Sequence, residues 1–137
     1  MKGIYVLVVQ LDYGSDMRVG KLGALHFEKG LYAYVGSAQI ALEKRIARHL
    51  GKEKRVFWHI DYLLQSSSAK ILKIFTKTAK KQEECTLAKQ IAAKGKAVEG
   101  FGCSDCRCIS HLIRINSHDF LRDSMQEYFL PSPSAFS

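Results

Sequence analysis

Long apolar runs and prolines are both scarce in this 137-residue sequence. No apolar run approaches the roughly 20 residues that cross a bilayer, and the apolar N-terminal stretch stops at Gln10, too early for a secretory signal. The two prolines, Pro131 and Pro133, stand near the C-terminus and mark residues 131–137 as a frayed tail. We therefore expect a cytoplasmic protein without a membrane partner, folded as one domain over residues 1–130.

Acidic residues are also in short supply. The chain has 13 Asp and Glu against 21 Lys and Arg, a formal net charge of +8, which suits a polyanionic partner such as nucleic acid. The excess is concentrated in residues 42–55 and 69–82, although each run is also compatible with an ordinary solvated face. The cations that we expect to contact nucleic acid are Lys44, Arg48, Lys52, Lys80 and Lys81.

The hydrophobic pattern predicts a mixed α/β fold of the α+β type, with a small central sheet of three or more strands flanked by helices. Apolar content of 47% is that of a globular chain and not of a disordered one. A strand over 3–11, apolar on both faces, would lie in the centre of the sheet, and a hairpin at Lys29-Gly30 would join strands near 23–28 and 31–36. Further strands are expected over 70–76 and 107–115, and helices over 41–50, 56–65, from a cap at Thr78 to about Lys94, and from Ser117 to about Leu130.

Glu84 is the residue that physical chemistry singles out. On the predicted third helix it shares a stripe with Leu87, Ala88 and Ile91, at i, i+3, i+4 and i+7. A carboxylate on an apolar face is unfavourable unless it is paired, neutralised or bound to a metal. Glu84 is therefore a metal ligand, a structural carboxylate paired with an Arg or a Lys, or part of a stripe that is not fully buried.

Arg45, Arg48 and His49 flank one side of the apolar stripe of the first predicted helix. Such a helix would present guanidinium and imidazole groups to a phosphate, while Leu42 and Ile46 hold it against the core. A solvated basic face is the alternative, above all for Arg48.

Two tripeptides, Gly3-Ile4-Tyr5 and Tyr34-Val35-Gly36, precede Arg45 on the next helix and Glu84 on a later one, and this order resembles the GIY-YIG nuclease superfamily. Taken singly, Tyr5 and Tyr34 would be ordinary core residues. The closer resemblance is to a small branch of that superfamily, found alone or fused to endonuclease III. It is carried by Ser37-Ala38, Arg48-His49-Leu50, Trp58-His59-Ile60-Asp61-Tyr62, residues 100–108 and His111-Leu112.

The resemblance implies phosphodiester hydrolysis with one divalent cation, Mg²⁺ or Mn²⁺. Glu84 would hold the cation, Arg45 would neutralise charge on the phosphoryl oxygens, and Tyr5 or Tyr34 would orient or deprotonate the attacking water. A tyrosine with a pKa near 10 needs a nearby cation or a metal-linked water for that role. His49 would position the phosphate or assist proton transfer.

The spacing of the tripeptides departs from that of the better-known nucleases. Tyr5 and Tyr34 are 29 positions apart, a much longer separation, and an extra hairpin within residues 12–28 would fill it. An insertion that shifted the strand register would separate the two tyrosines.

Four potential zinc ligands, Cys103, Cys106, Cys108 and His111, fall within nine residues. On a strand over 107–115, however, Cys106 and Cys108 would share one face and His111 would lie on the other. The segment is therefore either a zinc site or a conformationally special turn that borders the active site. Cys85, next to Glu84, is expected to be a small core residue.

His59 and Asp61 lie two positions apart on the predicted second helix, where they would face about 200° from each other. We expect a hydrogen-bonded core histidine that borders the site and an aspartate that caps the helix or forms a salt bridge.

Three functions remain open on these grounds. The first is a metal-dependent endonuclease that acts on DNA in preference to RNA, in a structure-directed or repair role. The second is a nucleic-acid-binding module that does not cut, and the third is a scaffold whose basic face meets a protein. Both tyrosines with Arg45 and Glu84 favour cleavage, because phosphate binding alone does not require a buried carboxylate.

Overall fold

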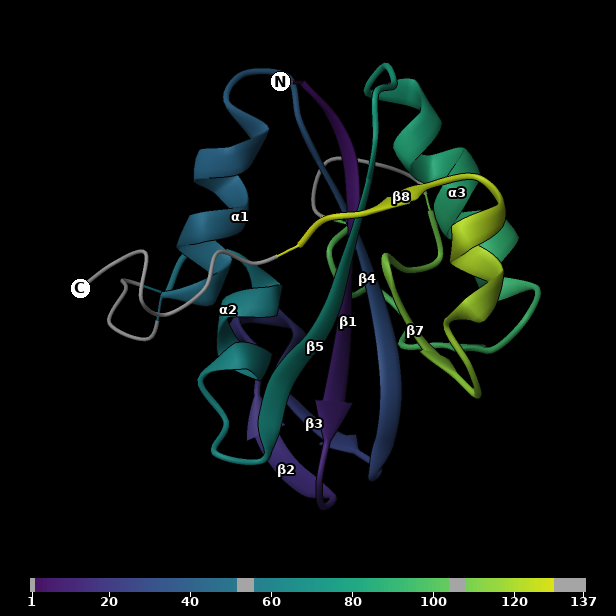
Figure 1. The fold of residues 1–137 in the computed structure, drawn as a ribbon. Helices are drawn as coiled ribbons and strands as arrows, with labels where there is room; N and C mark the ends of the chain where they lie inside the picture. Colours follow the sequence, from purple (N-terminus) through teal and green to yellow (C-terminus); the bar gives the residue numbers. More distant parts are fainter. Residues whose placement is uncertain (1, 52–55, 104–107, 130–137) are drawn as a thin grey trace.

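The most apolar segment of the chain forms β1 (Gly3–Leu11) in the middle of a six-stranded antiparallel sheet of order β6-β7-β4-β1-β5-β8 (Figure 1). The structure is a computed structural model that describes residues 2–51, 56–103 and 108–129. β1 pairs along its whole length with β4 (Gly30–Ala38) and on its other side with β5 (Ala69–Lys77). Both faces of β1 are buried, so the prediction of a central strand is confirmed.

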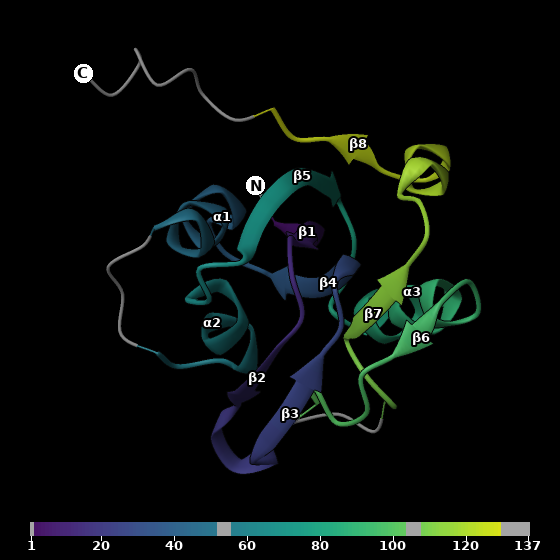
Figure 2. The same cartoon turned by 90° about the horizontal axis from the view of Figure 1, so that it is seen from below.

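The sheet separates two apolar cores, and helices cover both faces (Figure 2). Helices α1 (Leu42–Leu50) and α2 (His59–Leu64) pack on the face that carries Tyr5 and Tyr34. Helix α3 (Gln82–Ala92) packs on the opposite face through Leu87, Ala88 and Ile91. The expected α+β fold, a central sheet flanked by helices, is therefore confirmed. No helix in the described part of the chain has the length and apolar character needed to cross a membrane.

Residues 12–28 form a small sheet of their own, in which β2 (Ser15–Arg18) pairs with β3 (Ala24–Phe27) around the 3-10 helix η1 (Gly20–Leu22). The extra hairpin expected within 12–28 is thus present. The expected hairpin at Lys29-Gly30 is wrong, because β3 does not pair with β4. The physical reason is that both edges of β4 are taken, one by the nine residues of β1 and the other by β7 (Leu112–Ile115).

The expected C-terminal helix is also wrong. Ser117 does accept a hydrogen bond from the Asp119 N–H, as a cap would, but the chain then forms only the 3-10 helix η2 (Asp119–Asp123) and the short strand β8 (Gln126–Glu127). β8 pairs with Phe75 and Thr76 of β5, and an unpaired sheet edge is a strong competitor for backbone hydrogen bonds. The end predicted for this helix, and the tail at 131–137, lie outside the described residues.

Three other boundaries differ from expectation. Helix α2 begins at His59 instead of residue 56, and α3 begins at Gln82 because the Glu83 carboxylate accepts the Lys80 N–H. The strand expected over 107–115 begins only at Leu112. The two-residue strand β6 (Lys96–Ala97) pairs with β7 and was not expected.

Asp61 joins α1 to α2 from a fully buried position. Both carboxylate oxygens accept hydrogen bonds from Arg48, at 3.0 and 2.9 Å, and Oδ2 also accepts the Phe57 and Trp58 N–H groups at 2.9 Å. Burial alone would raise the pKa of Asp61, but these hydrogen bonds outweigh it and hold the pKa below its usual value. The interpretation of Asp61 as a capping, salt-bridged residue is confirmed.

Replacing this carboxylate should destabilise the fold. We expect Asp61→Ala to lower the free energy of unfolding by about 3 kcal/mol, because Arg48 and two backbone donors lose their acceptor. Asp12→Ala is the matched control, since its 3.7 Å contact with Lys70 is exposed and such pairs contribute about 1 kcal/mol or less. Urea unfolding of both variants measures the difference, and equal losses would contradict the assigned role of Asp61.

Candidate active site

A cleft of about 880 Å³ opens beside the strand end where β1 begins and β4 ends. Its lining includes Tyr5, Tyr34, Arg45 and Glu84, four of the five residues to which the resemblance assigns chemistry. They come from β1, β4, α1 and α3, so the cleft is assembled from both faces of the sheet. His59, Lys81, Cys103 and His111 also line it.

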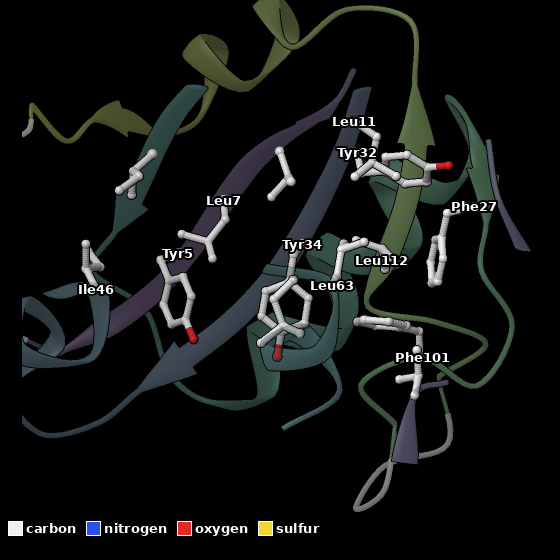
Figure 3. Packing of buried hydrophobic residues seen from close by; sticks show 14 of the residues in the cluster. Tyr5, Leu7, Leu11, Phe27, Tyr32, Tyr34, Ile46, Leu63, Phe101 and Leu112 are labelled. Atoms are coloured by element: carbon white, nitrogen blue, oxygen red, sulfur yellow. The ribbon is translucent and has the colours of Figure 1, made fainter. Parts of the chain in front are cut away.

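The two tyrosines lie on one face of adjacent strands. In the antiparallel register, Tyr5 is opposite Gly36 and Tyr34 is opposite Leu7, which places both rings on the side covered by α1. Figure 3 shows both hydroxyl groups pointing the same way. The long insertion leaves the pairing of the tripeptides intact because it folds back on itself as β2 and β3. The insertion has therefore not separated the two tyrosines, which lie on neighbouring strands.

Gly36 makes room for Tyr5. A Cβ built at this position would overlap the Tyr5 ring at its hydroxyl end, so the ring lies directly against the glycine backbone. No larger residue allows this approach while β1 and β4 keep their register. Glycine is therefore required at position 36, in the second tripeptide, because the Tyr5 ring of the first tripeptide packs against it.

Tyr5 is linked to a histidine behind it. Its hydroxyl lies 2.7 Å from Nε2 of His49, a residue that is 2% exposed and packs against Tyr34 and Trp58. His49 does not line the cleft and reaches it through the Tyr5 hydroxyl. Of the two roles expected for His49, proton transfer fits this burial better than contact with a phosphate.

Neither tyrosine ionises easily. Burial raises the pKa of Tyr5 well above its ordinary value near 10, although the charge of Arg45 and a hydrogen bond from it act in the opposite direction. Burial likewise raises the pKa of Tyr34. Both side chains are therefore protonated at neutral pH and act as hydroxyl groups.

Arg45 is held in place at the mouth of the cleft. Its Nη1 donates to the Ser37 carbonyl oxygen at 3.1 Å, and its guanidinium lies 4.5 Å from the centre of the Trp58 ring. A guanidinium stacked on indole and hydrogen-bonded on one side keeps its remaining donors oriented. Arg48 lies over the same ring at 4.2 Å.

Glu84 lies in the first turn of α3 and is partly buried. Its Oε2 accepts the Ser37 hydroxyl at 2.7 Å, and its Oε1 lies 2.9 Å from Nδ1 of His111. Burial would raise the pKa of Glu84, but the hydrogen bonds from His111 and Ser37 prevail and lower it. The carboxylate is therefore charged at neutral pH, and it is the only one among the described residues that line the cleft.

The surrounding charge is positive. Lys21, Arg45 and Lys81 line the cleft against the single carboxylate of Glu84. Of the other cations expected to contact nucleic acid, Lys44 is exposed on α1 and Lys80 is exposed just before α3. Arg48 is hydrogen-bonded to Asp61, and Lys52 lies outside the described residues.

His59 lines the cleft and is hydrogen-bonded as expected. Its Nδ1 accepts the Gly102 N–H at 2.8 Å, and burial lowers the pKa of the imidazole, so this ring is neutral. Gly102 has a φ of +75° and approaches His111 and Tyr34, a conformation that favours glycine. The contact fastens the turn before β7 to α2.

The cysteines are arranged differently from expectation. Because β7 begins at Leu112, the argument that an extended strand separates Cys108 from His111 is wrong. The ligand atoms of Cys108, His111 and Cys85 lie within 4.8 Å of one another. Cys85, which was expected in the core, is partly buried and lines the cleft. The Cys103 thiol donates instead to the Phe101 carbonyl oxygen at 3.5 Å, and Cys106 lies outside the described residues.

Several lining residues were missed by sequence reasoning as contributors to the site, among them Lys21, Ser37, Phe57 and Trp58. Ser37 directly follows the second tripeptide, a position that could have drawn attention to it. Lys21 stands between Gly20 and Gly23 in the insertion, and nothing in the sequence indicates that this turn faces α2 and the cleft.

The family comparison covers nearly the whole chain. The model of the family described as "Domain of unknown function DUF123" matches residues 4–131. The chain belongs to the DUF123 family. Every residue that lines the cleft of this DUF123 chain lies within the match. No curated protein and no solved structure matches the chain.

A methyl group at Gly36 should disturb this DUF123 site directly. We expect Gly36→Ala to cost about 1–3 kcal/mol of unfolding free energy, because the added Cβ forces the Tyr5 ring or the strand to move. Gly51→Ala is the control, since a Cβ there meets only backbone oxygens at 3.5 Å or more, and its effect should stay below about 1 kcal/mol. Urea unfolding measures both values, and an unaffected Gly36→Ala variant would refute the close contact.

The raised pKa values of the buried tyrosines can be tested by absorbance. We expect the tyrosinate signal gained up to pH 10.5 to be the same in the parent and in Tyr5→Phe, because Tyr5 stays protonated until the chain unfolds. The unfolded chain ionises its tyrosines near pH 10. Because the folded pKa of Tyr5 lies above that value, the protonated Tyr5 hydroxyl favours the folded state. This contribution to stability is fully present below pH 10 and is lost as the pH rises beyond it. A smaller signal in Tyr5→Phe would show an ordinary, exposed hydroxyl.

Proposed function

We propose that the chain is a divalent-metal-dependent endonuclease that hydrolyses phosphodiester bonds in DNA, with RNA as a less favoured substrate. The observation that carries the proposal is the convergence of the Tyr5 hydroxyl, the Arg45 guanidinium and the Glu84 carboxylate on one cleft. These groups are the set that the resemblance to the GIY-YIG superfamily implies. They supply an oriented hydroxyl, a cation for the phosphate and an anion for a metal ion.

Glu84 fits a hard divalent cation. Mg²⁺ and Mn²⁺ are commonly bound through one or two carboxylates together with water and substrate phosphate oxygens. Glu84 is charged, reaches the cleft, and stands beside the Ser37 hydroxyl in a space wide enough for water and a phosphate. Such an ion would polarise the phosphoryl group and stabilise the departing oxygen.

Arg45 is suited to bind the phosphate that is cut. Its planar guanidinium can donate two parallel hydrogen bonds to phosphate oxygens and carries a permanent charge. The Trp58 ring and the Ser37 carbonyl oxygen hold it at the cleft before substrate arrives. A cation positioned in advance stabilises the charge that develops on the phosphoryl oxygens without reorganising.

Tyr5 is suited to orient the attacking water and to pass on its proton. Because the pKa of Tyr5 is raised, a free tyrosinate does not form at neutral pH. The contact of 2.7 Å with His49 offers another route, in which the hydroxyl takes a proton from water as it gives its own to Nε2. Within the described part of the chain Tyr34 has no such histidine partner for its hydroxyl, which would act as a hydrogen-bond donor to the substrate.

The cleft is better suited to an unpaired or branched strand than to continuous duplex. Phe57 is 75% exposed, lines the cleft and packs edge-on against Trp58. An exposed aromatic ring beside arginines is a stacking platform for unpaired bases. This agrees with the structure-directed role expected from the sequence.

Binding without cleavage is the second candidate function. It is favoured by the raised pKa values of both tyrosines and by the two contacts that already occupy the Glu84 carboxylate. In this case the positive cleft would hold the phosphate backbone, and Glu84 would only position Ser37 and His111.

One experiment separates the two functions. Plasmid, single-stranded and branched DNA are incubated in Mg²⁺ or Mn²⁺ with the parent chain, with Glu84→Gln and with Glu83→Gln. Glu83 is the matched control because it is the next residue and is exposed, with its carboxylate on the Lys80 N–H. We expect Glu84→Gln to lower the cleavage rate by about 100-fold or more, as loss of a strong electrostatic contact does, and Glu83→Gln to keep nearly the parent rate.

If the parent chain cleaves none of these substrates, or if Glu84→Gln cleaves as fast as the parent, the nuclease proposal is wrong. Binding that weakens with added salt and survives in Glu84→Gln without cleavage would support the second candidate. Absence of both cleavage and binding would support the third function, a scaffold whose basic face contacts a protein partner.

A further inference from the structure

Three ligand groups of the kind that bind transition metals meet beside the cleft. The Cys85 Sγ, the Cys108 Sγ and a ring nitrogen of His111 all lie within 4.8 Å of one another, and Cys85 Sγ is 3.8 Å from His111 Nε2. His111 is buried, and both cysteines are partly buried and free of disulfides. The three residues come from α3 and from the segment just before β7, so the arrangement is a product of folding and not of local sequence.

The hydrogen bonds of His111 determine which of its nitrogens can bind a metal. Nδ1 lies 2.9 Å from Oε1 of Glu84 and 3.1 Å from the Val35 carbonyl oxygen, and both of these atoms accept hydrogen bonds. Nδ1 must therefore carry the hydrogen. In the neutral ring this leaves Nε2 as the lone-pair nitrogen, and Nε2 is the atom that faces Cys85.

This pattern is typical of metal-bound histidines. In such sites the second ring nitrogen donates to a carboxylate or a backbone carbonyl, which fixes the ring and increases its basicity as a ligand. Here Glu84 and Val35 supply one of each. A histidine that only filled the core would have no need of two acceptors on one nitrogen and a thiol at the other.

The separations are close to those of a zinc site. With Zn–S near 2.3 Å and Zn–N near 2.0 Å, tetrahedral ligands lie roughly 3.5–3.8 Å apart. The 3.8 Å between Cys85 Sγ and His111 Nε2 is already at the upper end of this range, and a separation at the limit of 4.8 Å would have to contract by about 1.0–1.3 Å.

We propose that Cys85, Cys108 and His111 form a binding site for a thiophilic divalent ion of the zinc class, with Glu84 as the residue that orients His111. Two thiolates and an imidazole select zinc over Mg²⁺ and Mn²⁺, so this site is chemically distinct from the oxygen-ligand role of Glu84. Three protein ligands leave a fourth position for water or another donor. Cys85 and His111 both line the cleft, so that position can open toward it.

The ion would add a second connection between two parts of the chain that already meet through the contact of Glu84 with His111. Cys85 belongs to the first turn of α3, and Cys108 and His111 belong to the turn that leads into β7. A bound ion would fasten this turn to α3 and fix His111 against Glu84. The site would therefore set the shape of one wall of the cleft.

Cobalt binding tests the site without any assay of DNA cleavage, so its result is independent of the proposed nuclease function. The full chain is freed of metal under reducing conditions and titrated with Co²⁺, which shows thiolate-to-cobalt charge-transfer absorption. We expect saturation at one equivalent and displacement by Zn²⁺. Cys85→Ser and Cys108→Ser should each weaken binding by more than about 100-fold, and Glu84→Gln by about 10-fold through the orientation of His111.

Cys103→Ser is the matched control, because Cys103 lines the same cleft but donates to the Phe101 carbonyl oxygen. It should keep the parent affinity. Metal-free variants are compared with the parent by circular dichroism, so that a misfolded chain is not mistaken for a lost ligand. Absence of the charge-transfer band in the folded parent, parent-like affinity in Cys85→Ser or Cys108→Ser, or a loss in Cys103→Ser as large as theirs would overturn the proposal.

Discussion

The close approach of the Tyr5 ring to Gly36 is the constraint on which the rest of the site depends. A ring that lies against bare backbone lets two central strands remain paired while its hydroxyl extends to the edge of the core. From there the hydroxyl reaches His49 on α1, and α1 in turn carries Arg45. One cross-strand contact therefore sets the distance between the sheet and the helix that supplies the cation. The 17 residues between 12 and 28 can be inserted without effect on this contact because they leave and rejoin the sheet at its opposite end.

Desolvation acts in the same sense on Tyr5, Tyr34 and Glu84, because burial raises the pKa of each, but the outcome differs. It keeps Tyr5 and Tyr34 protonated, whereas at Glu84 it is outweighed by hydrogen bonds from Ser37 and His111. The outcome is one anion surrounded by neutral hydroxyl groups, with cations at the margin. An approaching phosphate is therefore attracted by Lys21, Arg45 and Lys81 and is repelled only by the Glu84 carboxylate. A divalent cation bound to Glu84 would replace this repulsion with attraction, because the cation itself binds the phosphate.

Local periodicity was sufficient to predict β1, α1 and the apolar stripe of α3, because each of these depends on the pattern of its own residues. It was also sufficient to single out Glu84, whose position conflicts with its neighbours Leu87 and Ala88. Strand partners depend on competition between distant segments, which is why the pairing of β3 and the fate of residues 117–129 could not be predicted. The meeting of Cys85 with Cys108 and His111 was hidden for the same reason, since it requires the packing of α3 against the turn before β7. The burial of His49 behind Tyr5 likewise depends on a contact 44 residues away.

The lysines of β5 affect how readily chains associate with one another through the edge of the sheet. β8 pairs with β5 only at Phe75 and Thr76, so within the described residues most of β5 forms an edge of the sheet. Exposed edges can recruit strands from other molecules, and charged lysines along an edge are a common protection against this. Lys70, Lys73 and Lys77 occupy such positions. Part of the positive charge that suggests a nucleic-acid partner thus has a second effect, which is to disfavour pairing of exposed strand edges between molecules.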